Sequence, residues 1–84
     1  MELNKEFVEK ISPAIYTTWD AIGPDYLENF GEDIDNEEAI EACIDAGRLE
    51  VFAGKEAQNL LTLACKTHGY SVVLNYLNQH ITLY

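Results

Sequence analysis

The segment DNEEAIEACIDAG, residues 35–47, has the clearest helical pattern in the chain. Its apolar side chains recur at helical spacing and share one face: Ala39, Ile40, Cys43 and Ile44. Its acidic side chains share the opposite face: Glu37, Glu38, Glu41 and Asp45. Asp35 or Asn36 can cap the first turn, and Gly47 suits the end. The segment therefore predicts an amphipathic helix that ends near Ala46 and exposes its carboxylates.

This helix lies within an acidic third of the chain, Asp20–Asp45. The run holds ten Asp or Glu residues and no Lys or Arg. Elsewhere five acidic and five basic side chains cancel, so the whole formal charge of −10 belongs to the run. Nine of its acids are candidates for contact with a partner: Asp25, Glu28, Glu32, Asp33, Asp35, Glu37, Glu38, Glu41 and Asp45. We expect that partner to be a basic protein, because complementary charges meet across interfaces.

The acidic run has two interpretations. It can be a solvated face that keeps the protein soluble, as many charge runs are. It can also be a binding surface that mimics nucleic acid, and the repulsion among ten like charges is easier to understand if the charge is used. Duplex DNA carries a charge every ~1.7 Å, whereas one carboxylate per helical turn gives one every ~5.4 Å. Mimicry therefore requires several acidic segments side by side.

Length and composition limit the class of protein. Eighty-four residues, 48 % of them hydrophobic, predict one folded domain that spans residues 1–84. No apolar run reaches ~18 residues, so we expect no membrane span. The first residues do not resemble a signal peptide, which predicts a cytoplasmic protein. The acidic balance disfavours direct binding of nucleic acid or of anionic membranes.

The first third of the chain predicts one long helix and one short helix. Apolar residues keep helical spacing from about residue 4 to 22, in register across Pro13. A proline inside a helix removes one backbone hydrogen bond. We therefore predict one helix bent near Pro13, in preference to two helices. Gly23-Pro24 is expected to end it, and residues 24–30 are expected to form a short helix that ends at Gly31.

The second half predicts a C-terminal helical hairpin. Residues 55–67 and 71–81 have helical periodicity, and His68-Gly69 separates them. The last helix is expected to bury one stripe of side chains: Tyr70, Val73, Leu74, Leu77 and Ile81. Arg48–Ala53 remains open between a helical turn, a strand and a connector. The predicted fold class is thus all-α, a single small domain of four to five short helices.

A calcium site is not expected. Acids alternate at Asp33, Asp35 and Glu37, as they do in an EF-hand loop. That loop requires Gly at its sixth position and Glu at its twelfth. Glu38 and Ile44 occupy these positions here, so the motif fails.

The thiols and imidazoles form no recognisable zinc or catalytic motif. Cys65 and His68 are three residues apart on one helix, but the spacing to Cys43 matches no zinc pattern. No third group is evident that would orient a thiol–imidazole pair for catalysis. We expect two free, buried cysteines and no metal, no cofactor and no catalytic residue.

Leu63 and Val72 point away from the predicted core stripes of their helices. Another helix can cover them in a small helical domain. Alternatively they form an apolar patch for a partner or for a homodimer.

In size, in the acidic run Asp20–Asp45 and in having no catalytic motif, the chain resembles the small acidic proteins that phages and mobile elements use against restriction or CRISPR systems. The resemblance is one of type and transfers no functional residue. It implies a non-enzymatic inhibitor that blocks a basic, nucleic-acid-binding groove in the host cytoplasm. The alternative is a small helical adaptor or homodimer with apolar contacts, whose acids serve only solubility.

Overall fold

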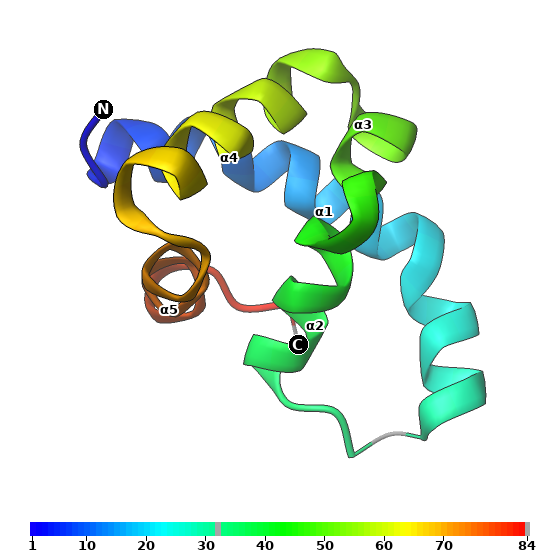
Figure 1. Cartoon of the computed structure of the whole chain (residues 1–84). Helices are drawn as coiled ribbons and strands as arrows, with labels where there is room; N and C mark the ends of the chain where they lie inside the picture. The colour runs from blue at the N-terminus through cyan, green and yellow to red at the C-terminus, as the bar shows by residue number, and fades with distance from the viewer. Residues whose placement is uncertain (32, 84) are drawn as a thin grey trace.

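The computed structural model describes residues 1–31 and 33–83. These residues form five α-helices and one 3-10 turn, and no strand is found among them. The elements in order are α1 (Lys5–Phe30), α2 (Asn36–Ile44), η1 (Asp45–Gly47), α3 (Arg48–Ala53), α4 (Lys55–His68) and α5 (Tyr70–His80). The predicted all-α fold is confirmed, and Figure 1 shows the helices folded around a common interior.

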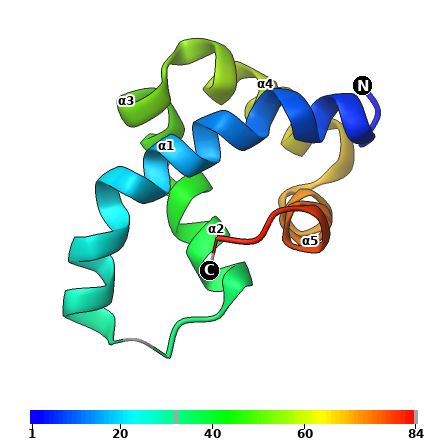
Figure 2. The ribbon, with the colours of Figure 1, turned by 180° about the vertical axis from the view of Figure 1, so that it is seen from behind.

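Helix α1 is longer than the sequence predicts. The Asn4 side chain caps it by accepting a hydrogen bond from the Phe7 N–H at 3.0 Å. The helix continues through Pro13, as predicted, and also through Gly23-Pro24, where we expected it to end. The predicted short helix is therefore the last part of α1, which ends before Gly31. Figure 2 shows α1 changing direction where blue passes into cyan, in the half of the helix that contains Pro24.

The prediction of an end at Gly23-Pro24 was wrong because burial of this part of α1, with Ile22 packed against the core cluster, outweighs the local signal. Gly23 is buried although glycine is a poor helix former. A Cβ at this position would lie 3.0 Å from Cε2 of Trp19, so any other residue would require the indole to shift. Pro24 lacks the N–H that would bond the Asp20 carbonyl, but a proline can kink a helix without ending it.

Helix α2 begins as predicted, and Asp35 is its cap. The Asp35 carboxylate accepts a hydrogen bond from the Glu38 N–H at 2.8 Å. The α-helix ends at Ile44, two residues before the predicted end, and continues as η1. Within η1 the backbone is left-handed at Ala46 (φ 52°) and at Gly47 (φ 70°). This turn redirects the chain, and the ambiguous segment Arg48–Ala53 follows as helix α3.

The predicted C-terminal hairpin is confirmed as α4 and α5, with Gly69 between them. The chain after α5 is held against the start of α2 by Asn36. Its Nδ2 donates to Asn78 Oδ1 at 2.8 Å and to the Ile81 carbonyl at 2.7 Å. Its Oδ1 accepts from the Leu83 N–H at 2.7 Å. Figure 1 shows the C-terminal end beside α2.

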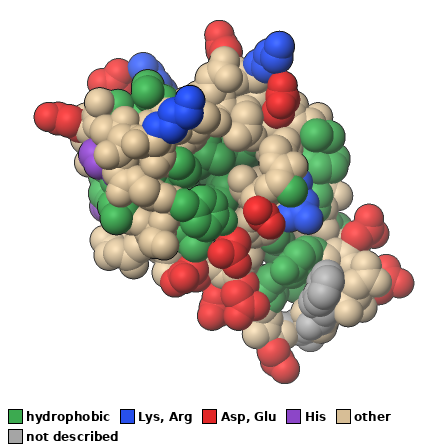
Figure 3. All heavy atoms as spheres, viewed as in Figure 1, with side chains coloured by type: hydrophobic (Ala, Val, Ile, Leu, Met, Phe, Trp, Pro, Cys, Tyr) green, Lys and Arg blue, Asp and Glu red, His purple; other side chains and the backbone are tan. Residues whose placement is uncertain are grey.

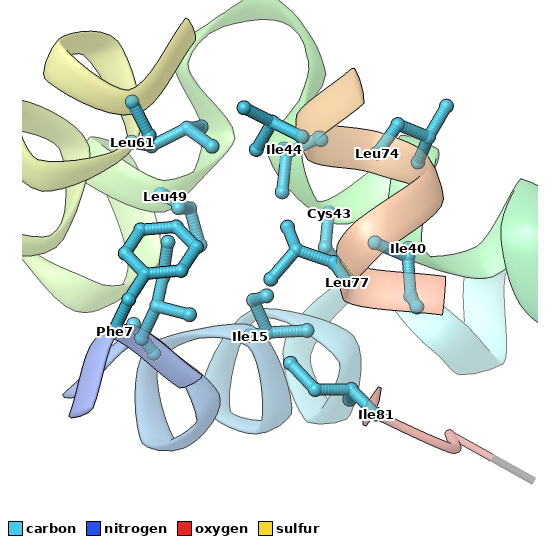
Figure 4. Packing of buried hydrophobic residues seen from close by; sticks show 14 residues of the cluster. Phe7, Ile15, Ile40, Cys43, Ile44, Leu49, Leu61, Leu74, Leu77 and Ile81 are labelled. Carbon is cyan, nitrogen blue, oxygen red and sulfur yellow. The ribbon is translucent and has the colours of Figure 1, made fainter. Parts of the chain in front are cut away.

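One hydrophobic cluster of buried side chains joins all five α-helices. Figure 4 shows them pointing into one interior. The predicted core faces of α1, α2 and α5 contribute most of this cluster. One expected member, Tyr70, is instead 39 % exposed. It is the first residue of α5, where the helix is only beginning to approach its neighbours.

Candidate partner-binding surface

The acidic face is defined here as the candidate acids that the structure describes: Asp25, Glu28, Asp33, Asp35, Glu37, Glu38, Glu41 and Asp45. All of them are exposed. The ninth candidate, Glu32, lies outside the described residues. Asp25 and Glu28 belong to the last part of α1, the next two to the connector, and the remaining four to α2 and η1.

In one view of the molecule the described acids of the face lie in two groups. Figure 3 shows one group of Asp and Glu side chains over α2, below the centre of the view. A second group lies at the lower right, over the end of α1. This second group belongs to the part of α1 that the sequence predicted as a separate short helix.

The acidic face keeps its charge unneutralised. Among the described residues, ion pairs occur only within α1, between Lys5 and Glu9 and between Lys10 and Glu6. Arg48 directly follows η1, but its Nη1 donates to the Ala42 carbonyl at 2.7 Å. Every described acid of the face therefore remains available to an external cation.

The pKa of the Tyr70 hydroxyl is influenced by the carboxylates at one end of the acidic face. Burial raises the pKa of its hydroxyl, and the carboxylates of Glu41 and Asp45 raise the pKa further. A negative charge disfavours the phenolate, and Asp45 lines the same hollow as Tyr70. The negative end of α2 thus faces the start of α5.

A hollow of about 420 Å³ lies at this same place, among η1, α4 and the start of α5. Ile44 and Leu61 form its buried apolar part, and Thr62 and Lys66 are exposed residues of its wall. Sequence reasoning missed this hollow because its walls come from segments that are distant in the chain. A larger groove of about 690 Å³ lies among α1, α3 and α4 and includes Pro13, Phe52 and Leu60.

The two cysteines differ in burial. Cys43 is fully buried, and burial raises the pKa of its thiol to about 12, while the nearby Arg48 charge lowers it in part. Cys65 is only half-buried, which corrects the expectation that both are buried. His68 Nε2 donates to the Met1 carbonyl at 2.7 Å. Within the described residues, no group of three or more His, Cys, Asp and Glu side chains is placed to hold a metal ion.

Apolar side chains are exposed on α3, α4 and α5. Leu63 and Val72 are each 51 % exposed, so the interpretation that another helix covers them is wrong. Val51 is 74 % and Phe52 42 % exposed. Sequence reasoning missed this second pair because the six-residue α3 is too short to show a periodic pattern.

Comparison with known proteins identifies no relative: no family model, no curated protein and no solved structure matches the chain. None of the helices in the described part of the chain combines the length and the apolar character needed to cross a bilayer.

Proposed function

We propose that this protein is a non-enzymatic cytoplasmic inhibitor of a basic protein, and that its acidic face occupies a groove that otherwise binds nucleic acid. In type it would match the phage or mobile-element proteins that are directed against restriction or CRISPR systems. One observation carries it. Every described acid of the face is exposed, and none forms an ion pair with a described Lys or Arg.

The charge arrangement supports a binding role over a purely solubilising one. Solubility requires net charge but no particular distribution. Here the charge of −10 belongs to one third of the sequence, while the acids and bases elsewhere cancel. Glu41 and Asp45 also approach the end of α2, where the helix dipole is negative and disfavours further negative charge. A cation from a partner would offset this unfavourable interaction between the carboxylates and the helix dipole.

The proposal is tested with a triple variant of α2 and η1, Glu37→Gln, Glu41→Gln and Asp45→Asn. The three side chains recur at i+4, so the variant removes one row of charge. The matched control is Glu2→Gln, Glu50→Gln and Glu56→Gln, which removes the same charge from exposed residues outside the face. Both variants and the wild type serve as baits in lysate, at low salt and at ~1 M salt, where screening shortens to ~3 Å.

We expect the wild type and the control to retain the same basic, nucleic-acid-binding protein at low salt and to release it at high salt. The α2 variant should retain much less, mainly through a slower association rate. Wild-type protein should also compete with nucleic acid for the captured protein. Equal capture by the α2 variant, or capture that salt does not weaken, would contradict the proposal.

The second candidate function is a helical adaptor or homodimer with apolar contacts. The exposure of Val51 and Phe52 favours it, because Phe52 also lines the groove of about 690 Å³. An exposed apolar patch beside a groove is typical of an interaction site. In this case binding would persist at high salt and would be lost on Phe52→Ser, whereas the α2 variant would bind normally.

A further inference from the structure

The hollow among η1, α4 and α5 combines an apolar interior with an acidic border. Its volume of about 420 Å³ falls in the ~300–1,000 Å³ range of small-molecule sites. Ile44 and Leu61 supply buried apolar surface, and the Tyr70 ring lies at its edge. Figure 3 shows hydrophobic side chains gathered at the centre of this view, with Asp and Glu side chains directly below them. Such a site suits an occupant with an apolar stem and a charged end.

The sign of that charge follows from the neighbouring residues. Asp45 is part of the wall of the hollow, and Glu41 lies one helical turn before it in the same exposed row. Lys66, from α4, is also part of the wall and supplies one positive charge. Two carboxylates against one ammonium leave the border net negative, so the hollow favours a cationic group.

A side chain of the wall, Gln58, also has an unused hydrogen-bond acceptor. Gln58 Nε2 donates to Thr62 Oγ1 at 3.3 Å, whereas Gln58 Oε1 is buried and accepts no hydrogen bond. Leaving a buried acceptor unsatisfied costs ~1–3 kcal/mol. This oxygen has no accessible surface, so the Gln58 side chain would have to rotate to meet a donor in the hollow, and that rotation would relieve the cost.

We infer that this hollow receives one arginine side chain of the basic partner. The aliphatic stem would pack on Ile44 and Leu61, and the guanidinium would pair with Asp45. Rotation of the Gln58 side chain would add its amide oxygen as a second acceptor. Arginine fits better than lysine for two reasons: its guanidinium is planar with five donors and is weakly hydrated, and it stacks on aromatic rings such as Tyr70. This inference rests on the proposed function, because it takes the partner to be a basic protein.

The test needs no partner protein. The amide resonances of isotope-labelled protein are followed by NMR during titration with N-acetyl-arginine amide. N-acetyl-citrulline amide, which has the same shape but a neutral urea group, is the matched ligand. We expect saturable shifts at Ala46, Gly47 and Thr62 with the arginine compound. The citrulline compound should bind about tenfold more weakly, as expected for the loss of a charge-assisted hydrogen bond.

Variants of the wall distinguish the hollow from the rest of the acidic face. Thr62→Trp fills the hollow without a change of charge and should abolish the shifts. Asn59→Trp, on an exposed residue of the same helix that does not line the hollow, should leave them intact. Asp45→Asn should weaken binding about two- to fivefold, and Lys66→Gln should strengthen it.

Three results would overturn the inference: equal binding of the arginine and citrulline compounds, shifts that survive Thr62→Trp, or equal binding of N-acetyl-lysine amide. The first two would show that the hollow is not the site, and the third that it does not select arginine. Each of these outcomes leaves the proposed function standing if lysate capture still depends on salt and on the α2 charges. Conversely, the proposed function can fail in lysate while the arginine compound still binds.

Discussion

Gly23 lies directly against the indole ring of Trp19. Trp19 is one helical turn earlier in α1. A Cβ at position 23 would come within 3.0 Å of Cε2 and 3.2 Å of Cδ2 of the ring. Glycine in a helix interior costs ~1 kcal/mol relative to alanine. The contact with the indole therefore explains why the chain tolerates this cost in the middle of its longest helix.

The first prediction is that Gly23→Ala stabilises the fold only when the indole is absent. In the wild type, the steric conflict should cancel or exceed the gain in helix propensity of ~1 kcal/mol. In a Trp19→Leu background the conflict is removed, so Gly23→Ala should stabilise the fold by about that propensity gain. Urea unfolding of the four proteins gives the coupling free energy. Equal effects in both backgrounds would show that the indole does not restrict residue 23.

The second prediction concerns Asn36, which makes three hydrogen bonds to the end of the chain. Asn36→Ala removes these bonds and should lower the free energy of unfolding by roughly 1–3 kcal/mol. Hydrogen exchange at the Leu83 amide should accelerate. Asn75→Ala, on an exposed residue of α5, is the control and should change the stability by less than ~0.5 kcal/mol. Similar losses in the two variants would argue against this role of Asn36.

The third prediction concerns pH. Burial raises the pKa of the Cys43 thiol from 9.0 to about 12, although the Arg48 charge opposes the shift. The unfolded chain therefore loses this proton at a lower pH than the folded protein does. The stabilisation that the raised pKa reflects is complete below about pH 9 and is lost as the pH rises towards 12, with a slope of up to ~1.4 kcal/mol per pH unit.

Urea unfolding of wild type and Cys43→Ala at pH values from 8 to 10.5, under reducing conditions, measures this effect. The wild type should lose stability more steeply than the variant. Cys65 and Tyr70, whose pKa values are also raised by burial, are present in both proteins and cancel in the comparison. Parallel pH dependences would mean that Cys43 ionises normally in the folded protein.

The fourth prediction compares two leucines of α4. Leu63 is 51 % exposed and Leu61 is buried. Leu63→Glu should fold with a stability within ~0.5 kcal/mol of the wild type, whereas Leu61→Glu should fail to fold because it buries an unpaired charge. Light scattering over a range of concentrations then tests self-association. A wild-type dimer that Leu63→Glu converts to a folded monomer would support the apolar interface, and a wild-type monomer would count against a homodimer.

The sequence by itself determined the helical class, the core faces of most helices and the chemistry of the acidic run. These features are local: apolar spacing places Ile40 and Cys43 on one face of α2, and Asp35 caps that helix with its own side chain. Exposure of the acids also follows locally, because they share the face opposite the apolar residues.

Tertiary contacts decided the features that join distant segments. The course of α1 through Gly23-Pro24 goes with the burial of Gly23 and the packing of Ile22 against the core cluster, which the local signal for a helix end cannot register. That extension also places Asp25 and Glu28 on α1 and not on a separate short helix. The hollow beside Asp45 exists only because α4 brings Gln58 and Leu61, and α5 brings Tyr70, to the left-handed turn at Ala46 and Gly47. Periodicity assigns a side chain to a face of its own helix, whereas the neighbour across that face is chosen by the packing of the whole chain.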